Sequence, residues 1–163
     1  MPDRLNFWAT SSLLCIKYPE FYNCFYLISR KWVKEKNNIY NPVCNVANHL
    51  YAGGKVLAGH VECLDFIEAN KSDFRIRKCK RLPVSGAFHT KIMDPAKGPF
   101  EEFLNSIDLS DPRIPVYSNF DHQIYRDVRS IKRYLPKQLT NQVKWEGVVN
   151  HLVKYKTNEQ WPR

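Results

Sequence analysis

The 163-residue sequence has no long hydrophobic run, too few acidic residues to balance its basic ones, and no paired cysteine motif. Its longest mostly apolar stretches, such as 21–28, are far shorter than the roughly 20 residues that span a bilayer, so no transmembrane segment is predicted. The first residues show neither the basic and then apolar pattern of a secretory signal nor the Arg-rich, acid-poor composition of a transit peptide. There is no internal repeat and no low-complexity tract.

The cysteines do not predict a disulfide framework. Their number, five, is odd, and without a secretory signal it indicates free thiols in a reducing compartment. A metal site made by His60, Cys63 and Cys79 is an alternative, but structural zinc sites normally show paired Cys-x-x-Cys or His-x-x-x-His ligands. We therefore expect buried structural thiols and no metal.

The shortage of acidic residues gives the chain a formal net charge of +9, from 25 Lys and Arg against 16 Asp and Glu. This charge favours an acidic partner: a nucleic acid, an anionic lipid surface, a phosphorylated cofactor or an acidic protein. No helix-turn-helix, zinc finger or RNP-like aromatic string accompanies the charge, so we expect no nucleic acid. The densest basic patch is Arg75, Arg77, Lys78, Lys80 and Arg81, and its simplest interpretation is a solvated strand face.

The chain divides at the polar run 34–38. Residues 1–40 are rich in aromatic side chains but show no period of 2 or 3.6, which predicts an irregular segment or sequence that does not belong to the fold. Strands at 43–50 and 55–58, a helix at 61–69 and a strand within 74–84 follow. Strand, strand, helix, strand is half of a split βαβ arrangement that lacks its opening strand and helix.

The remaining residues predict mainly helices. Asp94 and Pro95 begin one helix in the favoured way. A short strand is expected at 114–118, a helix at 128–139 that Pro136 interrupts or kinks, and a last helix from Trp145. The 44% apolar content is enough for a real core.

The most informative stretch is 82–93, where a strand enters a small Ser-Gly-Ala loop that presents Phe88 and His89 just before a helix. Such a loop can expose an imidazole at the mouth of a pocket, where it moves protons near neutral pH. The alternative is a surface histidine in a connecting loop, without a catalytic role. Ser85 lies nearby, but a loop does not provide the strained turn and amide donors that activate a serine.

These residues carry a family resemblance. PVSGAFHT at 83–90, MDPA at 93–96, IPVYSN at 114–119 and QLTNQVKW at 138–145 closely resemble malonyl-CoA:acyl carrier protein transacylases, most of all the animal mitochondrial branch. The segment 45–60 is similar to that family's small subdomain. The resemblance covers about 41–160, and we see no counterpart for 1–40.

The resemblance implies an α/β fold: a partial α/β-hydrolase-like acyltransferase domain with half of a ferredoxin-like small subdomain. The small subdomain would occupy 41–84 and the carboxyl-terminal part of the large subdomain 85–163, with 1–40 irregular. The implied activity is an S-malonyltransferase of fatty-acid synthesis in the mitochondrion. A serine takes malonyl from coenzyme A, and the phosphopantetheine thiol of acyl carrier protein then removes it. No bound cofactor is implied, since coenzyme A belongs to the substrate and phosphopantetheine to the partner.

Site roles are carried over residue by residue. His89 matches the family's catalytic histidine, and Gln138 a residue whose main-chain carbonyl holds the other ring nitrogen of that histidine. Phe88 resembles the malonyl-preferring members, in which bulk crowds an α-methyl branch. Asn48 is assigned to substrate binding. The residues assigned to docking of the carrier protein are Arg75, Arg77 and Lys80.

The chain also departs from the family pattern. The Gly-Gln-Gly block, the Gly-His-Ser-x-Gly elbow and the downstream arginine of the family are absent, and the nearest string, GHVEC at 59–63, has valine in place of the serine. We therefore expect a chain that looks incomplete at both ends and is inactive alone. The competing class is a non-catalytic basic module that binds nucleic acid or an acidic protein.

Overall fold

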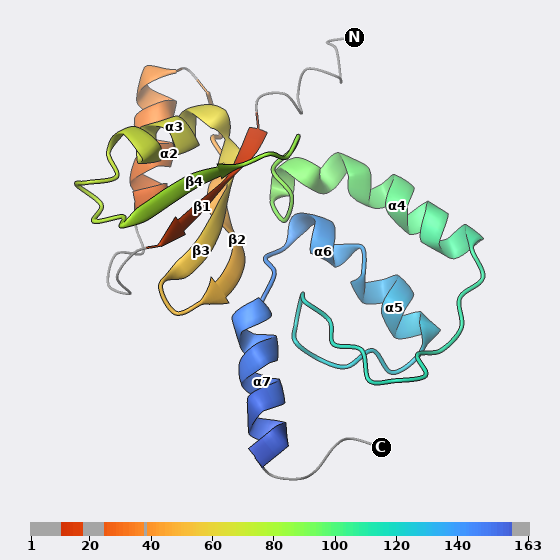
Figure 1. Ribbon diagram of the computed structural model, residues 1–163. Coiled ribbons are helices and arrows are strands. Elements are labelled where there is room, and N and C mark those ends of the chain that lie inside the picture. Colours follow the sequence, from red (N-terminus) through yellow and green to blue (C-terminus); the bar gives the residue numbers. More distant parts are fainter. Residues whose placement is uncertain (1–10, 18–24, 38, 158–163) are drawn as a thin grey trace.

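The computed structural model describes residues 11–17, 25–37 and 39–157, and its first half is a four-stranded antiparallel sheet with two helices (Figure 1). The strands lie in the order β2-β3-β1-β4. The elements are β1 (Ser11–Lys17), α2 (Phe25–Lys36), β2 (Cys44–Tyr51), β3 (Gly54–His60), α3 (Val61–Ala69) and β4 (Lys78–Leu82).

This βαββαβ order corrects the expectation of half a ferredoxin-like subdomain, because β1 and α2 supply the opening strand and helix. The prediction that 1–40 is irregular is wrong for 11–17 and 25–36. Strand β1 is central and pairs with both β3 and β4. It buries Leu13, Leu14 and Ile16. Because side chains on both of its faces are buried, its sequence is a continuous apolar run and lacks the alternation of apolar and polar residues that marks a half-exposed strand. The remaining part of the predicted irregular segment (1–10, 18–24 and 38) lies outside the described residues.

The predicted hairpin and the helix after it are confirmed. Strands β2 and β3 pair through a tight turn in which Gly53 has φ 71°, a conformation that favours glycine. Helix α3 covers 61–69 as expected. The predicted strand within 74–84 is shorter than expected, because 71–75 form turns and β4 begins only at Lys78.

The sheet is apolar on both faces. One face packs Leu14, Ile16 and Leu57 against α2 and α3, which contribute Val33, Leu64 and Ile67. The other face presents Leu13, Val56 and Ala58 to Ala87 and Ile92. These last two residues flank His89, so the loop that carries the histidine is itself a layer of the core.

The second half is helical: η1 (Lys91–Met93), α4 (Asp94–Ser106), α5 (Val128–Tyr134), α6 (Lys137–Thr140) and α7 (Trp145–Thr157). The break expected at Pro136 separates α5 from α6. At the start of α5, the Asp127 carboxylate accepts the Ser130 amide in a capping box, and this hydrogen bond lowers the pKa of Asp127. No helix in the described part of the chain is long and apolar enough to cross a membrane.

The strand predicted at 114–118 is wrong. Tyr117 forms only an isolated bridge with Ile124, and Ile114 is 71% exposed. A strand needs a neighbouring strand to take up its backbone hydrogen bonds, and within the described residues this segment has only the one bridge.

The segment before α7 fastens the helical half to the sheet. The Val143 amide donates to the Ala47 carbonyl at 2.7 Å, and the His49 amide donates to the Val143 carbonyl at 2.9 Å. Lys55 on β3 pairs with Glu146 on α7 at 2.8 Å. The backbone bonds extend β2 in a parallel direction, which fixes where α6 and α7 lie relative to the sheet.

Packing around Gly59 generates a stability prediction. A Cβ at this position would overlap the Val43 carbonyl oxygen and lie 2.7 Å from the Cα of Cys44, whereas a Cβ at Gly98 in α4 meets nothing within 4 Å. We expect Gly59→Ala to lower the free energy of unfolding by more than about 2 kcal/mol. Gly98→Ala should raise it by about 0.5–1 kcal/mol, since alanine favours a helix interior.

Urea unfolding of both variants beside the parent tests this. If Gly59→Ala has the same urea midpoint as the parent, Gly59 of β3 does not lie as close to Val43 as described.

Candidate functional site

The candidate site is the turn that carries His89 between β4 and η1. Gly86 and Ala87 are buried beneath it, and the turn lies against the sheet on one side and α6 on the other (Figure 1). His89 itself is only partly buried. A small-residue loop therefore presents the imidazole, as predicted, whereas its place at the mouth of a pocket stays a prediction.

Two consecutive carbonyls of α6 hold His89. Its Nδ1 lies 2.6 Å from the carbonyl oxygen of Gln138, and its main-chain N–H donates to the carbonyl of Leu139 at 2.9 Å. A carbonyl can only accept, so Nδ1 carries the proton of the neutral ring and Nε2 keeps its lone pair. The contact expected between His89 and the main chain of Gln138 is present.

The backbone of His89 is in the left-handed region, with φ 65°. Such a conformation costs a residue other than glycine on the order of 1–3 kcal/mol and persists only where surrounding contacts enforce it. The carbonyls of α6 and the packing of Ala87 are such contacts. From this backbone conformation the ring reaches the Gln138 carbonyl of α6.

Phe88 and Asn48 lie on the same face of the sheet as His89. Phe88 is partly buried and packs against the cluster that contains Ala87. Asn48 is a partly buried residue of β2, beside an irregularity in the strand and bridged to Val143. The fold thus gathers Phe88, Asn48, His89 and Gln138 around one side of the sheet, and none of these contacts identifies a substrate.

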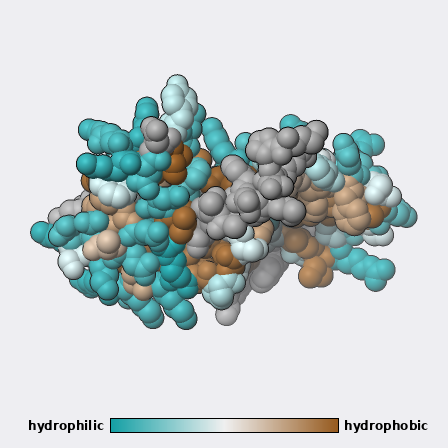
Figure 2. Space-filling view, turned by 90° about the horizontal axis from the view of Figure 1, so that it is seen from above, coloured by the Kyte–Doolittle hydropathy of each residue, from teal (hydrophilic) through white to brown (hydrophobic). Residues whose placement is uncertain are grey.

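The structure divides the basic patch. Arg81 pairs with Asp65 and Glu68 of α3, so its charge is balanced on the helical face of the sheet. Side chains alternate along a strand, which puts Lys80 on the opposite face with Leu82 and the His89 turn. Arg75 and Arg77 are exposed in the link before β4, and hydrophilic side chains cover most of this end of the molecule in the view from above (Figure 2).

Two of the described cysteines lie in the core, and Cys15 and Cys79 are only partly buried. Cys44 and Cys63 are fully buried beneath α2, and a hydrogen bond between them raises the pKa of Cys44 well above its usual value and lowers that of Cys63. His60 Nδ1 accepts the Val43 amide at 2.8 Å. Among the residues that the structure describes, no three His, Cys, Asp or Glu side chains gather as metal ligands. Cys63 therefore contacts Cys44. Among the described residues it does not form a metal site with His60 and Cys79, the alternative raised from the sequence.

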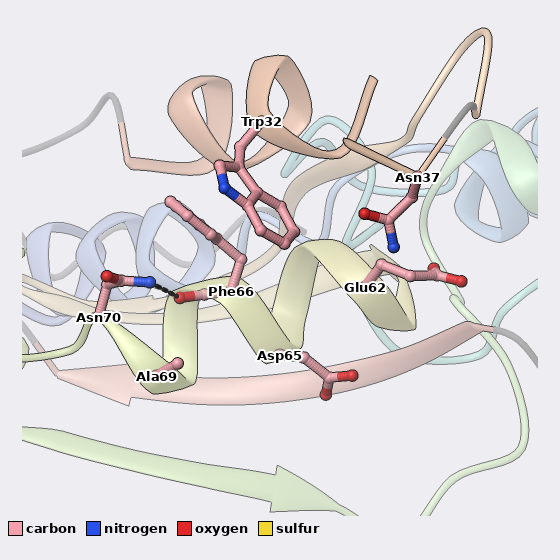
Figure 3. Close-up of a pocket in the computed structure, with 7 residues that line it drawn as sticks. All are labelled: Trp32, Asn37, Glu62, Asp65, Phe66, Ala69 and Asn70. Carbon is pink, nitrogen blue, oxygen red and sulfur yellow. Dashed lines mark hydrogen bonds between the residues drawn. The ribbon is translucent and has the colours of Figure 1, made fainter. Parts of the chain in front are cut away.

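Two hollows lie away from His89. One, of about 510 Å³, opens between α2 and α3, where the rings of Trp32 and Phe66 lie 4.8 Å apart beside Glu62 (Figure 3). It is on the helical face of the sheet, opposite the histidine. The other, of about 810 Å³, lies between α5 and α7 and includes Arg129 and His151.

Sequence reasoning missed Thr90. This residue is 1% exposed, and its hydroxyl makes two hydrogen bonds across the turn. A threonine just before a short helix is a signal for such a bond, because its hydroxyl can accept the backbone amide two residues later.

Comparison with known proteins finds transacylases that match the sequence and the fold of this chain. No protein-family model matches the chain. It is 43% identical over 135 residues to the probable mitochondrial malonyl-CoA-acyl carrier protein transacylase of Drosophila melanogaster, a match to 83% of this chain and 35% of that protein. The solved malonyl CoA-acyl carrier protein transacylase of Coxiella burnetii superposes with a TM-score of 0.78 at 22% identity, over 91% of this chain and 45% of that one.

A third match is the complex of a type II polyketide acyl carrier protein with its malonyl-transacylase, with a TM-score of 0.78, 21% identity and coverage of 91% and 46%. These structures show an acyltransferase fold, as expected. The 135 residues of the fly match are too many to fit within 41–163, so the likeness reaches into the first 40 residues, where we expected no counterpart.

The chain spans about a third of the length of the curated relative, 35%, and a little under half of the solved chains. Its sequence match covers 135 of its 163 residues, which is long enough that it must include the His89 turn. Over 83% of its own length, the chain is therefore similar to part of a malonyl-CoA-acyl carrier protein transacylase.

Proposed function

We propose that this chain supplies the acid–base side of a site that moves malonyl from coenzyme A to the phosphopantetheine thiol of acyl carrier protein in fatty-acid synthesis. The observation that supports it best is the 2.6 Å contact between His89 Nδ1 and the Gln138 carbonyl. This contact does the work of the aspartate in a Ser-His-Asp triad, because it selects the ring tautomer and orients the ring. The nucleophilic serine would come from the part of the family's length to which this chain has no counterpart.

In the first half-reaction, His89 Nε2 takes the serine proton as the serine oxygen bonds to the malonyl carbonyl carbon. The carbon–sulfur bond then breaks, and the imidazolium gives its proton to the coenzyme A thiolate. In the second half-reaction, the imidazole takes the proton of the phosphopantetheine thiol, whose sulfur bonds to the malonyl carbon. The serine oxygen leaves and recovers the proton, so the ring returns to its starting state.

Phe88 and Asn48 complete the proposal. The ring of Phe88 is braced against Ala87 and its neighbours, so it cannot retreat to make room for a methyl branch. Asn48, on β2, would direct its side-chain amide toward the acyl group. Both roles rest on position and resemblance.

The proposed partner is an acyl carrier protein, and the exposed cations Arg75, Arg77 and Lys80 are its proposed docking residues. One matched structure is a complex between a carrier protein and its malonyl-transacylase. The name of the fly relative includes "mitochondrial", which supports that compartment for this chain. We propose no bound cofactor. These names favour transfer to a carrier protein over the basic binding module.

The test of His89 uses a chimera. The region of the fly protein that precedes its matched segment is joined to this chain, and malonyl transfer to holo carrier protein is followed. We expect His89→Ala to lower the rate by on the order of 100-fold or more, as for other positioned acid–base groups. Gln138→Ala should have a smaller effect, because the contact uses a main-chain oxygen.

His151→Ala is the control, since this histidine lies on α7 beside Tyr117. A chimera that keeps its rate within a factor of about two after His89→Ala would remove His89 from the mechanism.

Charge at the proposed docking residues should act on the encounter with the carrier protein. In the chimera, Arg77→Glu with Lys80→Glu is expected to raise the KM for carrier protein by about fivefold or more at low salt, with little change in kcat. The matched control reverses two exposed charges at the α4–α5 end, Arg113→Glu with Arg129→Glu. Equal KM values for the two double variants would show that Arg77 and Lys80 have no specific role in docking and lie on an ordinary solvated surface.

A further inference from the structure

The buried hydroxyl of Thr90 holds the two ends of the His89 turn together. Its Oγ1 donates to the carbonyl of Ala87 at 2.7 Å and accepts the amide of Ile92 at 3.2 Å. Thr90 is 1% exposed, so water does not compete for either bond. One side-chain oxygen therefore bridges the residue two before His89 and the residue three after it.

Both residues that Thr90 bridges are buried against the sheet. Ala87 and Ile92 are buried in one cluster with Leu13, Val56 and Ala58. The hydroxyl thus ties the turn to the buried cluster that packs on the sheet. His89 stands between these anchors with φ 65°.

The outer side of the turn is held by α6. Its carbonyls at Gln138 and Leu139 accept the His89 ring Nδ1–H and main-chain N–H, respectively. These bonds form only if the backbone of His89 stays in its left-handed conformation. The inner bridge at Thr90 enforces the conformation that the outer bonds require.

We infer that Thr90 is a positioning residue for the proposed reaction: its hydroxyl fixes the tautomer and direction of the His89 imidazole without touching substrate. This inference rests on the proposed function for its relevance to catalysis. Removal of the hydroxyl frees the turn, breaks the Nδ1 contact and lets the neutral ring protonate at Nε2, where it can no longer act as a base.

The test reads the ring directly and needs no turnover. The chain is labelled with ¹⁵N, and imidazole signals are recorded at a pH well above the usual imidazole range. The spectrum of His89→Gln assigns the His89 signals. In the parent, we expect His89 protonated at Nδ1. Thr90→Val, which keeps the volume, and Thr90→Ala should lower the Nδ1-protonated fraction by about twofold or more, whereas Thr90→Ser should retain it.

Ser118→Ala is the matched control. It removes another buried hydroxyl, whose bond to the Phe120 amide lies outside the His89 turn. We expect this variant to leave the His89 signals unchanged even where it lowers the free energy of unfolding as much as Thr90→Val does. A general loss of stability is thereby separated from loss of the ring's position.

Parent-like His89 signals in Thr90→Val and Thr90→Ala would overturn the inference, as would a tautomer shift in Thr90→Ser. A second measurement needs no variant: the Ile92 amide of the parent should exchange with solvent deuterium slowly, and exchange as fast as an exposed amide would also overturn it. A chimera that fails to transfer malonyl bears on the proposed function alone, because none of these signals depends on transfer.

Discussion

An antiparallel sheet with apolar side chains on both faces cannot leave either face in water, and this constraint organises the molecule. Helices α2 and α3 cover one face, where Leu14, Ile16 and Leu57 pack. Against the other face pack Ala87, just before His89, and Ile92 of η1, just after it. Burial of apolar surface, worth roughly 25 cal/mol per Å², therefore holds the functional loop in place. The precision of the site comes from the core beneath it.

A core-anchored turn explains how a strained histidine persists. Its left-handed backbone is stabilised from inside by Thr90 and from outside by the carbonyls of Gln138 and Leu139. The outer clamp depends on α6, and α6 is placed by the backbone bonds between Val143 and β2. The imidazole is thus oriented by two parts of the chain that are distant in sequence, and each is attached to the same sheet. The proposed acid–base group is thus oriented in advance, which lowers the free energy that its reorientation would cost.

The sequence predicted what depends on local pattern. The hairpin at Gly53, helix α3 and the break at Pro136 follow from turn chemistry and helical periodicity, and all are confirmed. Strand β1 was missed because a central strand buried on both faces has no alternation, and the segment 114–118 was overpredicted because β-branched residues favour a strand only where a partner strand is at hand. The contact between His89 and Gln138 was expected through family resemblance, since no local pattern relates residues so far apart. The bridging role of Thr90 could not be predicted from the sequence, because it depends on which carbonyl its hydroxyl reaches in the folded chain.

The central claim is that this chain contributes the base of the transfer site and not its nucleophile. Intact-mass measurement of the purified chain after incubation with malonyl-CoA and holo carrier protein tests it most directly. The account predicts that neither protein gains the mass of a malonyl group, because a positioned imidazole without its serine has no oxygen to activate. A malonyl adduct on this chain, at Ser85 or at any other residue, or malonylated carrier protein formed at an enzyme-like rate, would contradict it.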